Sequence, residues 1–221
     1  MLVIGTANHE KGLELADLLR PVGVETRTLA DFPDDYQVVE DGDSFAANAC
    51  LKAALYARRL RHWVLADDSG LAVDALAGQP GIFSARYAGP DATDESNNLL
   101  VLDQLGDMPL PRRTARFVCH VALADPAGEI QAQSEAACRG RIIFEPRGSE
   151  GFGYDPLFEI VEYHRTFAEL GQRVKAVLSH RSRAICHLIP QLMLLADSKK
   201  IRPTPPCGRV RGGRLQELRG E

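Results

Sequence analysis

Two adjacent acidic residues, Asp67 and Asp68, mark the place in the chain where catalytic chemistry is first expected. They follow the apolar run 63–66, which predicts a short buried strand that ends at this pair. Because adjacent residues of a strand point to opposite faces, only one of the two carboxylates can face a given cleft. That carboxylate could act as a general base or bind a metal ion, and the alternative is that the pair caps a turn.

A second candidate segment joins a predicted first strand at 2–5 to a predicted first helix. Its backbone N–H groups, hydroxyl, amide and ammonium could hold a phosphate at the start of that helix. It has neither the GxxxxGK[ST] pattern nor the GxGxxG pattern, so those two phosphate-binding classes are disfavoured. The alternative is an ordinary loop with an asparagine cap. The segment consists of Thr6, Ala7, Asn8, His9, Glu10 and Lys11.

A later loop places two aromatic rings and a carboxylate between glycines, just before a proline. Such a loop can offer a ring for stacking, and the alternative is a tight turn whose rings belong to the core. Its candidate residues are Phe152, Gly153, Tyr154 and Asp155.

Lys175, His180 and Arg181 lie just before and at the start of the predicted last helix. Positive donors beside free backbone N–H groups suit anionic or keto-oxygen ligands. Alone, these residues would be interpreted as solvated surface charges. Together with a carboxylate, a phosphate-compatible loop and an aromatic loop, they complete the components of a metal-assisted nucleoside polyphosphate site.

The elements that must position these residues alternate between strands and helices, which favours an α/β or α+β globule. A hairpin is predicted around the turn 125–128, and Ser44 is expected to cap the clearest helix. Strands are predicted at 2–5, 24–28, 36–40, 63–66, 116–124 and 129–138, and helices at 44–60, 93–105 and 180–196.

The composition of the 221 residues narrows the class of protein further. A hydrophobic fraction of 45% and a charged fraction of 25% are typical of globular proteins. The net charge of −4 does not favour nucleic-acid binding. Five cysteines without a CxxC spacing favour a reducing cytoplasm, and no apolar stretch is long enough to cross a membrane. We expect a cytoplasmic domain over 1–197 and a basic, flexible tail over 198–221.

Six motifs, in order, resemble those of the non-standard purine nucleoside triphosphate pyrophosphatases, also called dITP/XTP pyrophosphatases or inosine triphosphatases. The resemblance extends over roughly 2–196. The motifs are TxNxxK at 6–11, EDGxSFxxNAxxKA at 40–53, ADDSGL at 66–71, PGxxSAR at 80–86, GFGYDP at 151–156 and KxxxSHR at 175–181.

This resemblance implies Mg²⁺-dependent hydrolysis of ITP, dITP or XTP to the monophosphate and pyrophosphate. It also implies an elongated, bent mixed β-sheet flanked by helices in two lobes, with the active-site cleft between the lobes, and a homodimer. Asp68 resembles the proton acceptor and a metal ligand, Glu40 is the choice for the second metal ligand, and Ser69 resembles a substrate contact.

The resemblance assigns different parts of the substrate to different segments. Residues 6–11 resemble the triphosphate-binding loop, and 152–155 resemble the nucleobase pocket, with Phe152 as the stacking ring. Lys175, His180 and Arg181 resemble the remaining substrate-binding donors.

The chain departs from the family pattern at two positions. Ala47 stands where the family usually has Glu, and Glu150 stands where it commonly has Gly. Two other functions stay open: a related pyrophosphatase acting on modified pyrimidine nucleotides, and a nucleotide-binding protein without catalytic activity, which Ala47 alone motivates.

Overall fold

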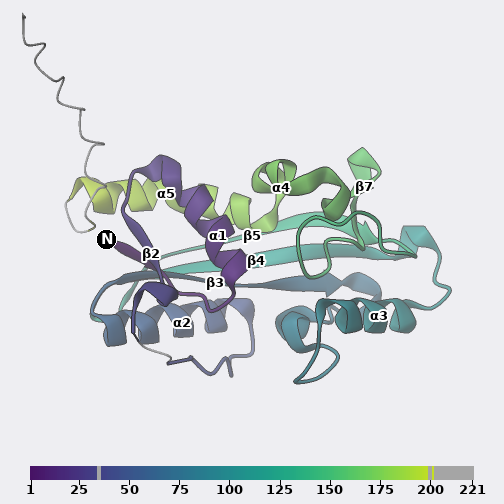
Figure 1. Ribbon diagram of the computed structural model, residues 1–221, viewed down its shortest axis with the longest axis horizontal. Coiled ribbons are helices and arrows are strands. Elements are labelled where there is room, and N and C mark those ends of the chain that lie inside the picture. Colours follow the sequence, from purple (N-terminus) through teal and green to yellow (C-terminus); the bar gives the residue numbers. More distant parts are fainter. Residues whose placement is uncertain (34–35, 199–200, 202–221) are drawn as a thin grey trace, which may run out of the picture.

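One mixed β-sheet runs along the molecule and carries helices on both faces (Figure 1). The computed structural model describes residues 1–33, 36–198 and 201. In this part of the chain the strand order is β2-β1-β3-β4-β5-β6-β7. Strand β1 pairs in parallel with β2 and β3, and the other neighbouring pairs are antiparallel. The strands are β1 (Leu2–Ile4), β2 (Thr26–Thr28), β3 (Trp63–Val73), β4 (Thr114–Ala124), β5 (Ile130–Ile142), β6 (Phe158–Ile160) and β7 (Arg165–Thr166).

Helices α1, α4 and α5 lie on one side of the sheet in Figure 1, and α2 and α3 lie on the other. The α/β mixed sheet with flanking helices that the family resemblance implied is therefore confirmed. The helices are α1 (His9–Leu19), α2 (Phe45–Leu60), α3 (Asp94–Leu105), α4 (Phe167–Leu178) and α5 (His180–Asp197).

The alternation of side chains along β1 divides the core between the two faces. Leu2 and Ile4 are buried with apolar residues of α1 and α5, whereas Val3 is buried with alanines of α2. A further cluster gathers residues from the far ends of β3, β4 and β5 with Val101 and Leu105 of α3. Apolar clusters thus pack against the sheet both near β1 and at the far ends of β3, β4 and β5.

Most predicted elements are confirmed. Strands β4 and β5 form the predicted hairpin, and the N–H of Gly128 donates to the carbonyl of Asp125 in its turn. The hydroxyl of Ser44 accepts from the N–H of Ala47 and caps α2 as expected. Within the described residues, we find no helix with the length and apolar character needed to span a membrane.

Two strand predictions are wrong. The strand that begins at Trp63 does not end at the aspartates but continues to Val73, because β4 pairs with it from Val64 to Val73. Residues 36–40 form no strand; Tyr36 instead packs its ring against Tyr56 of α2. The predicted basic tail at 198–221 lies, apart from Ser198 and Ile201, outside the described residues.

Candidate functional site

The aspartate pair lies in the middle of β3, and its two side chains leave the strand on opposite faces, as predicted. Asp67 shares its face with Leu65, which packs with α1 and α5, and Asp68 shares its face with Ala66, which packs with α2. Both side chains are buried, so each carboxylate depends on the polar groups that its own face supplies.

Asp67 is surrounded by cations. Its Oδ2 accepts from the Ser69 hydroxyl at 3.0 Å and from Arg181 Nε at 3.3 Å, and Lys11 Nζ lies 3.9 Å away. Burial alone would raise the pKa of Asp67, but these cations and the Ser69 hydroxyl hold it well below its usual range. Asp67 is therefore a fixed negative charge that balances Lys11 and Arg181.

Asp68 has a different environment. Its Oδ2 accepts from Asn48 Nδ2 at 3.1 Å, and its Oδ1 lies 3.6 Å from Lys52 Nζ. Burial raises the pKa of Asp68 above the ordinary aspartate value, although Lys52 and Lys11 act in the opposite direction. Of the two aspartates, Asp68 binds a proton more readily, which is the property a proton acceptor needs.

Lys52 of α2 brings the predicted metal ligands together. Its Nζ lies 2.8 Å from a carboxylate oxygen of Glu40 and 3.6 Å from that of Asp68. Burial tends to lower the pKa of Lys52, but Asp68, Asp67 and Glu40 raise it overall, so the ammonium stays charged. Lys52 and Asn48 were not among the predicted site residues; their signal was the four-residue spacing, which puts both on one face of α2.

The donor set on this side suits Mg²⁺, which is commonly held by one or two carboxylates together with water and phosphate oxygens. Glu40 and Asp68 provide two carboxylates that face one ammonium group. Over the described residues no cluster of three or more metal-binding side chains occurs. These two residues therefore fit Mg²⁺ as a partial set that substrate phosphates and water would complete.

On the other face of the sheet, buried cations alternate with carboxylates, of which Glu14 is half-buried. Glu14 of α1 pairs with Arg181 and, at 3.0 Å, with Lys175. Lys175 in turn lies 2.6 Å from Asp155. Burial lowers the pKa of Arg181, but Asp67 and Glu14 raise it overall. Sequence reasoning missed Glu14, whose only signal was its place three residues after Lys11 on the same helix face.

The predicted phosphate loop is divided between two hollows. Asn8 caps α1 by accepting from the N–H of Lys11 at 2.9 Å, so the alternative interpretation as an N-cap is correct for its side chain. Asn8 and Lys11 line the first pocket described below. Thr6, Ala7 and His9 line a neighbouring hollow together with Asn8. The side chain of Glu10 is exposed and lines neither.

The aromatic glycine loop is held by a carboxylate. Asp155 Oδ2 accepts from the N–H of Phe152 at 3.0 Å as well as from Lys175. Gly151 has a positive φ of 80°, and a Cβ there would lie 2.2 Å from Asp155 Oδ2, so only glycine fits. The pKa of Asp155 is raised by burial, against the effect of Lys175.

The two rings of this loop have separate environments. Tyr154 is buried, and its hydroxyl donates to the carbonyl of Ser84 at 2.8 Å, so it is a core residue that also borders the pocket. Phe152 is partly exposed, and Lys175 Nζ lies 4.1 Å from its ring centroid. Phe152 is thus the ring that is available to a ligand.

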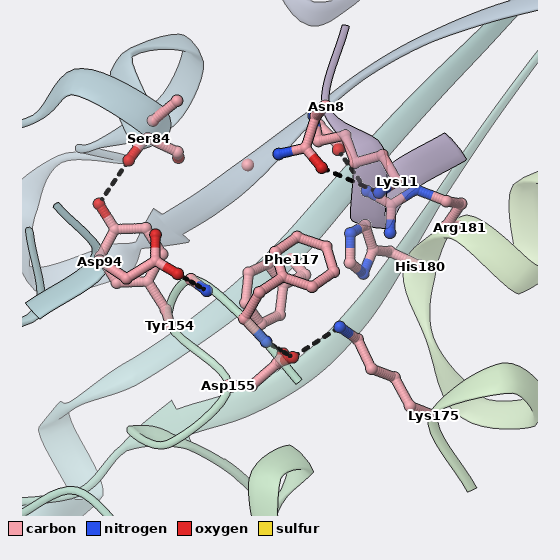
Figure 2. Close-up of a pocket in the computed structure, with 15 residues that line it drawn as sticks. Asn8, Lys11, Ser84, Asp94, Phe117, Tyr154, Asp155, Lys175, His180 and Arg181 are labelled. Atoms are coloured by element: carbon pink, nitrogen blue, oxygen red, sulfur yellow. Dashed lines mark hydrogen bonds and ion pairs between the residues drawn. The ribbon is translucent and has the colours of Figure 1, made fainter. Parts of the chain in front are cut away.

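Figure 2 shows the pocket, of about 100 Å³, in which most of the predicted substrate-binding residues meet. His180 stacks on Phe117 there, and burial together with Arg181 and Lys175 keeps the pKa of its imidazole well below the usual value. Neither Asp68 nor Glu40 lines this pocket. The predicted residues that do so are Asn8, Lys11, Ser69, Phe152, Gly153, Tyr154, Asp155, Lys175, His180 and Arg181.

Comparison with known proteins shows to which family this chain belongs. A sequence model described as the Ham1 family matches residues 2–191. The chain belongs to the Ham1 family. A Rhodopirellula baltica protein named dITP/XTP pyrophosphatase is 51% identical over 197 residues, which cover 89% of this chain and 95% of that protein. A Geobacillus kaustophilus protein of the same name is 49% identical, covering 86% of this chain and 93% of that one.

Solved structures of Ham1 proteins have the same fold. The HAM1 protein of Coxiella burnetii superposes with a TM-score of 0.78 at 36% identity, over 87% of this chain and 98% of that chain. A nucleoside-triphosphatase / dITP/XTP pyrophosphatase of Mycobacterium abscessus gives a TM-score of 0.69 at 42% identity, over 86% of this chain and 98% of that chain. The resemblance identified from the six motifs is therefore confirmed.

The two departures from the Ham1 pattern have different local environments. Glu150 accepts from the N–H of Gln172 at 3.2 Å, directly after Gly171 interrupts the helical geometry of α4. Glu150 therefore caps the second half of α4 and has a structural use. Ala47 lies in the first turn of α2, next to Asn48, and brings no carboxylate to the Asp68 side.

Proposed function

We propose that this protein hydrolyses dITP, ITP and XTP to the nucleoside monophosphate and pyrophosphate. The prediction of a nucleoside triphosphate pyrophosphatase is confirmed at the level of enzyme class by the match to curated relatives of that name. The finer assignments below are our proposals.

One observation carries the proposal. The pocket places a ring, Phe152, and the cations Lys175 and Arg181 beside Lys11 at the start of α1. Lys11 and Arg181 both approach Asp67, whose strand neighbour Asp68 faces the Glu40 and Lys52 side. The nucleobase can therefore lie at Phe152, the phosphates beside Lys11, and the proton acceptor Asp68 at the next residue of β3 after Asp67.

In the proposed reaction the oxygen of a water molecule forms a bond to the α-phosphorus, and the bond from this phosphorus to the bridging α–β oxygen breaks. Asp68 accepts the proton of the water, and pyrophosphate leaves with the bridging oxygen. Asn48 and Lys52 hold the Asp68 carboxylate in position, since both approach it from α2.

The phosphates need positive charge, because a triphosphate carries close to four negative charges near neutral pH. Lys11 and the free N–H groups at the start of α1 would hold the leaving pyrophosphate. Mg²⁺ held by Glu40 and Asp68 would neutralise the charge that develops on the phosphate oxygens.

Selection of the base would depend on the 6-position of the purine. Hypoxanthine and xanthine present a keto acceptor there, whereas adenine presents an amino donor. Arg181 or a backbone N–H directed at that position would leave two donors facing each other with ATP, which costs about 1–3 kcal/mol when buried. The Arg181 guanidinium donates to Asp67, Glu14 and Ser69, one N–H from each nitrogen, and its remaining N–H groups are available for such a contact.

We further propose that the enzyme uses Mg²⁺, forms a homodimer, acts in the cytoplasm and has no nucleic-acid partner. In this proposal 1–197 is the pyrophosphatase domain. Light scattering coupled to size-exclusion chromatography tests the dimer, and a single-protomer mass at micromolar concentration would reject it.

Phosphorus NMR tests the activity. Purified protein with Mg²⁺ is incubated separately with XTP, ITP, GTP, ATP and dUTP, in water enriched in ¹⁸O. We expect monophosphate and pyrophosphate from XTP and ITP, with the ¹⁸O in the monophosphate and ATP nearly unchanged. Orthophosphate as product, or ¹⁸O in pyrophosphate, would reject the reaction; preference for dUTP would favour a pyrimidine enzyme, and no turnover would favour a non-catalytic binder.

A further inference from the structure

The first half of α3 holds the aromatic loop by both backbone groups of one residue. The N–H of Gly153 donates to Asp94 Oδ2 at 2.6 Å, and the carbonyl of Gly153 accepts from Asn98 Nδ2 at 2.9 Å. Asp94 and Asn98 are four residues apart, so they lie on the same face of the helix. Figure 2 shows Asp94 directed at the loop that contains Tyr154.

The same helix also holds a second segment that lines the pocket. Asn97 accepts from the N–H of Ala88 at 2.8 Å and donates to the carbonyl of Ala85 at 3.3 Å. Ala85 and Gly153 both line the pocket. One turn of α3 therefore holds two pocket-lining segments that lie far apart in the sequence.

The composition of this turn is unusual for a helix that packs on a core. Asn97 and Asn98 are 3% and 7% exposed, although asparagine is a poor helix former and is costly to bury. The helix starts at this point because Thr93 and Ser96 form a capping box. The buried amides are thus aimed at the two loops rather than used to stabilise α3 itself.

The loop needs such anchoring. Gly151 and Gly153 have φ values of 80° and 62°, and a glycine backbone is free to leave such conformations when it is not held. Phe152 lies between these two glycines; Asp155 holds the N–H of Phe152 itself, and the bonds of Gly153 fix the backbone on its other side. Holding a ring in place before a ligand arrives lowers the entropy cost of binding.

We propose that Asp94 and Asn98 are positioning residues that hold Gly153 so that the Phe152 ring is ready for the nucleobase. This inference rests on the proposed function, since the base must stack on Phe152. Asp94 and Asn98 do not touch the phosphates in this scheme. They therefore affect the affinity for the nucleobase and leave the hydrolytic step unchanged.

Steady-state kinetics with XTP test the role of Asp94. Asp94→Ala should raise KM about tenfold with kcat changed less than about twofold, which corresponds to the loss of about 1.4 kcal/mol of binding. Asp94→Asn keeps an acceptor oxygen for the Gly153 N–H and should recover most of the affinity. Glu95→Ala, exposed on the same turn, removes the same charge from the start of α3 and should behave as wild type.

Asn98→Leu tests the second anchor. It removes the donor to Gly153 while also removing Asn98 Oδ1, which is buried without a hydrogen-bond partner among the described residues. Stability should therefore change little while KM rises. Inhibition by pyrophosphate, which has no base, should be the same in every variant.

A double-mutant cycle distinguishes positioning from general damage to the fold. In a Phe152→Ala background, Asp94→Ala should have almost no further effect on KM, because the ring that it positions is absent. An equal effect of Asp94→Ala with and without Phe152 would overturn the inference.

Hydrogen exchange of the ligand-free protein gives a readout that does not need activity. Amides of the loop 151–155 should exchange faster in Asp94→Ala and Asn98→Leu than in wild type and Glu95→Ala, with exchange in the β-strands unchanged. Unchanged exchange, or unchanged KM in an active enzyme, would reject the positioning role. If wild type turned over no nucleotide while exchange responded as expected, the proposed function would fail and the anchoring of Gly153 would stand.

Discussion

At the scale of single residues, one strand gives two neighbouring aspartates opposite properties. Asp67 meets two cations and a hydroxyl, whereas Asp68 meets an amide and one shared lysine. The pKa of Asp67 is lowered and that of Asp68 is raised, although the two carboxylates are adjacent in sequence. The pair therefore separates a structural charge from a proton acceptor.

Asp68→Asn should lower kcat by about 10²–10⁴-fold, because the amide cannot accept the proton from water. Nucleotide binding should persist, since the side chain keeps its shape. Single-turnover kinetics and a binding titration with XTP measure the two effects. Asp74→Asn, an exposed change at the end of the same strand, is the matched control. A kcat within tenfold of wild type would remove Asp68 from this role.

His180 makes the stability of the protein depend on pH. Its buried imidazole has a lowered pKa because of burial and of the cations Arg181 and Lys175, although Asp67 acts in the opposite direction. The unfolded chain therefore binds a proton at a pH where the folded protein does not. This contribution to stability is fully present above the unfolded pKa, about 6.5, and is lost as the pH falls toward the folded pKa.

Denaturant titrations between pH 7.5 and 5 should accordingly show a falling free energy of unfolding. From His180 alone the slope is at most about 1.4 kcal/mol per pH unit. His180→Phe keeps a ring against Phe117 and should flatten this part of the profile. A variant with the same slope as wild type would assign the pH dependence to other groups.

At the scale of elements, the turn Gly81–Arg86 packs closely against β3 because Gly70 of this strand has no side chain. A Cβ on Gly70 would lie 2.3 Å from Ser84 Oγ and 2.5 Å from the carbonyl oxygen of Gly81. Ser84 Oγ in turn accepts from the N–H of Leu71 and donates to Gly81. The close approach of this turn to β3 puts Ser84 and Ala85 at the edge of the pocket.

Gly70→Ala should therefore lower the free energy of unfolding by about 1–3 kcal/mol and raise KM, because the turn must move away from the strand. Gly12→Ala is the informative comparison. A Cβ there meets only Thr6 Cγ2, at 3.7 Å, inside α1, so this change should stabilise the protein by about 0.5–1 kcal/mol. Thermal and urea unfolding measure both variants, and equal effects would contradict the steric explanation.

At the scale of the whole molecule, a series of buried charges and the half-buried Glu14 joins segments from distant parts of the chain. It runs from Asp67 in β3 through Arg181 of α5 and Glu14 of α1 to Lys175 of α4, and ends at Asp155 of the aromatic loop. Each inner member has partners on both sides. The series therefore ties the sheet, three helices and the pocket into one unit.

Glu14→Gln should destabilise the protein by about 1–3 kcal/mol, because Arg181 and Lys175 lose a shared charged partner while each keeps one carboxylate, Asp67 or Asp155. The exposed Asp17→Asn on the same helix should change stability by less than about 0.5 kcal/mol. Urea unfolding compares the two variants. If Glu14→Gln were as mild as Asp17→Asn, the buried series would not hold the helices together.

The sequence by itself determined what depends on a few neighbouring residues. The caps at Asn8 and Ser44 and the turn of the hairpin act over three or four residues, and all were readable from residue types. The opposite facing of Asp67 and Asp68 follows from strand geometry alone. Six motifs in order were also enough to identify the family.

Only the tertiary structure decided which distant groups meet. The length of β3 depends on pairing with β4, about 50 residues later in the chain, and so the strand passes through the aspartates instead of ending there. Glu14 and Arg181 are 167 residues apart, and Asn98 and Gly153 are 55 apart. No local pattern encodes such contacts, because burial and the packing of separate elements, rather than neighbouring residues, select the partners of a buried charge or amide.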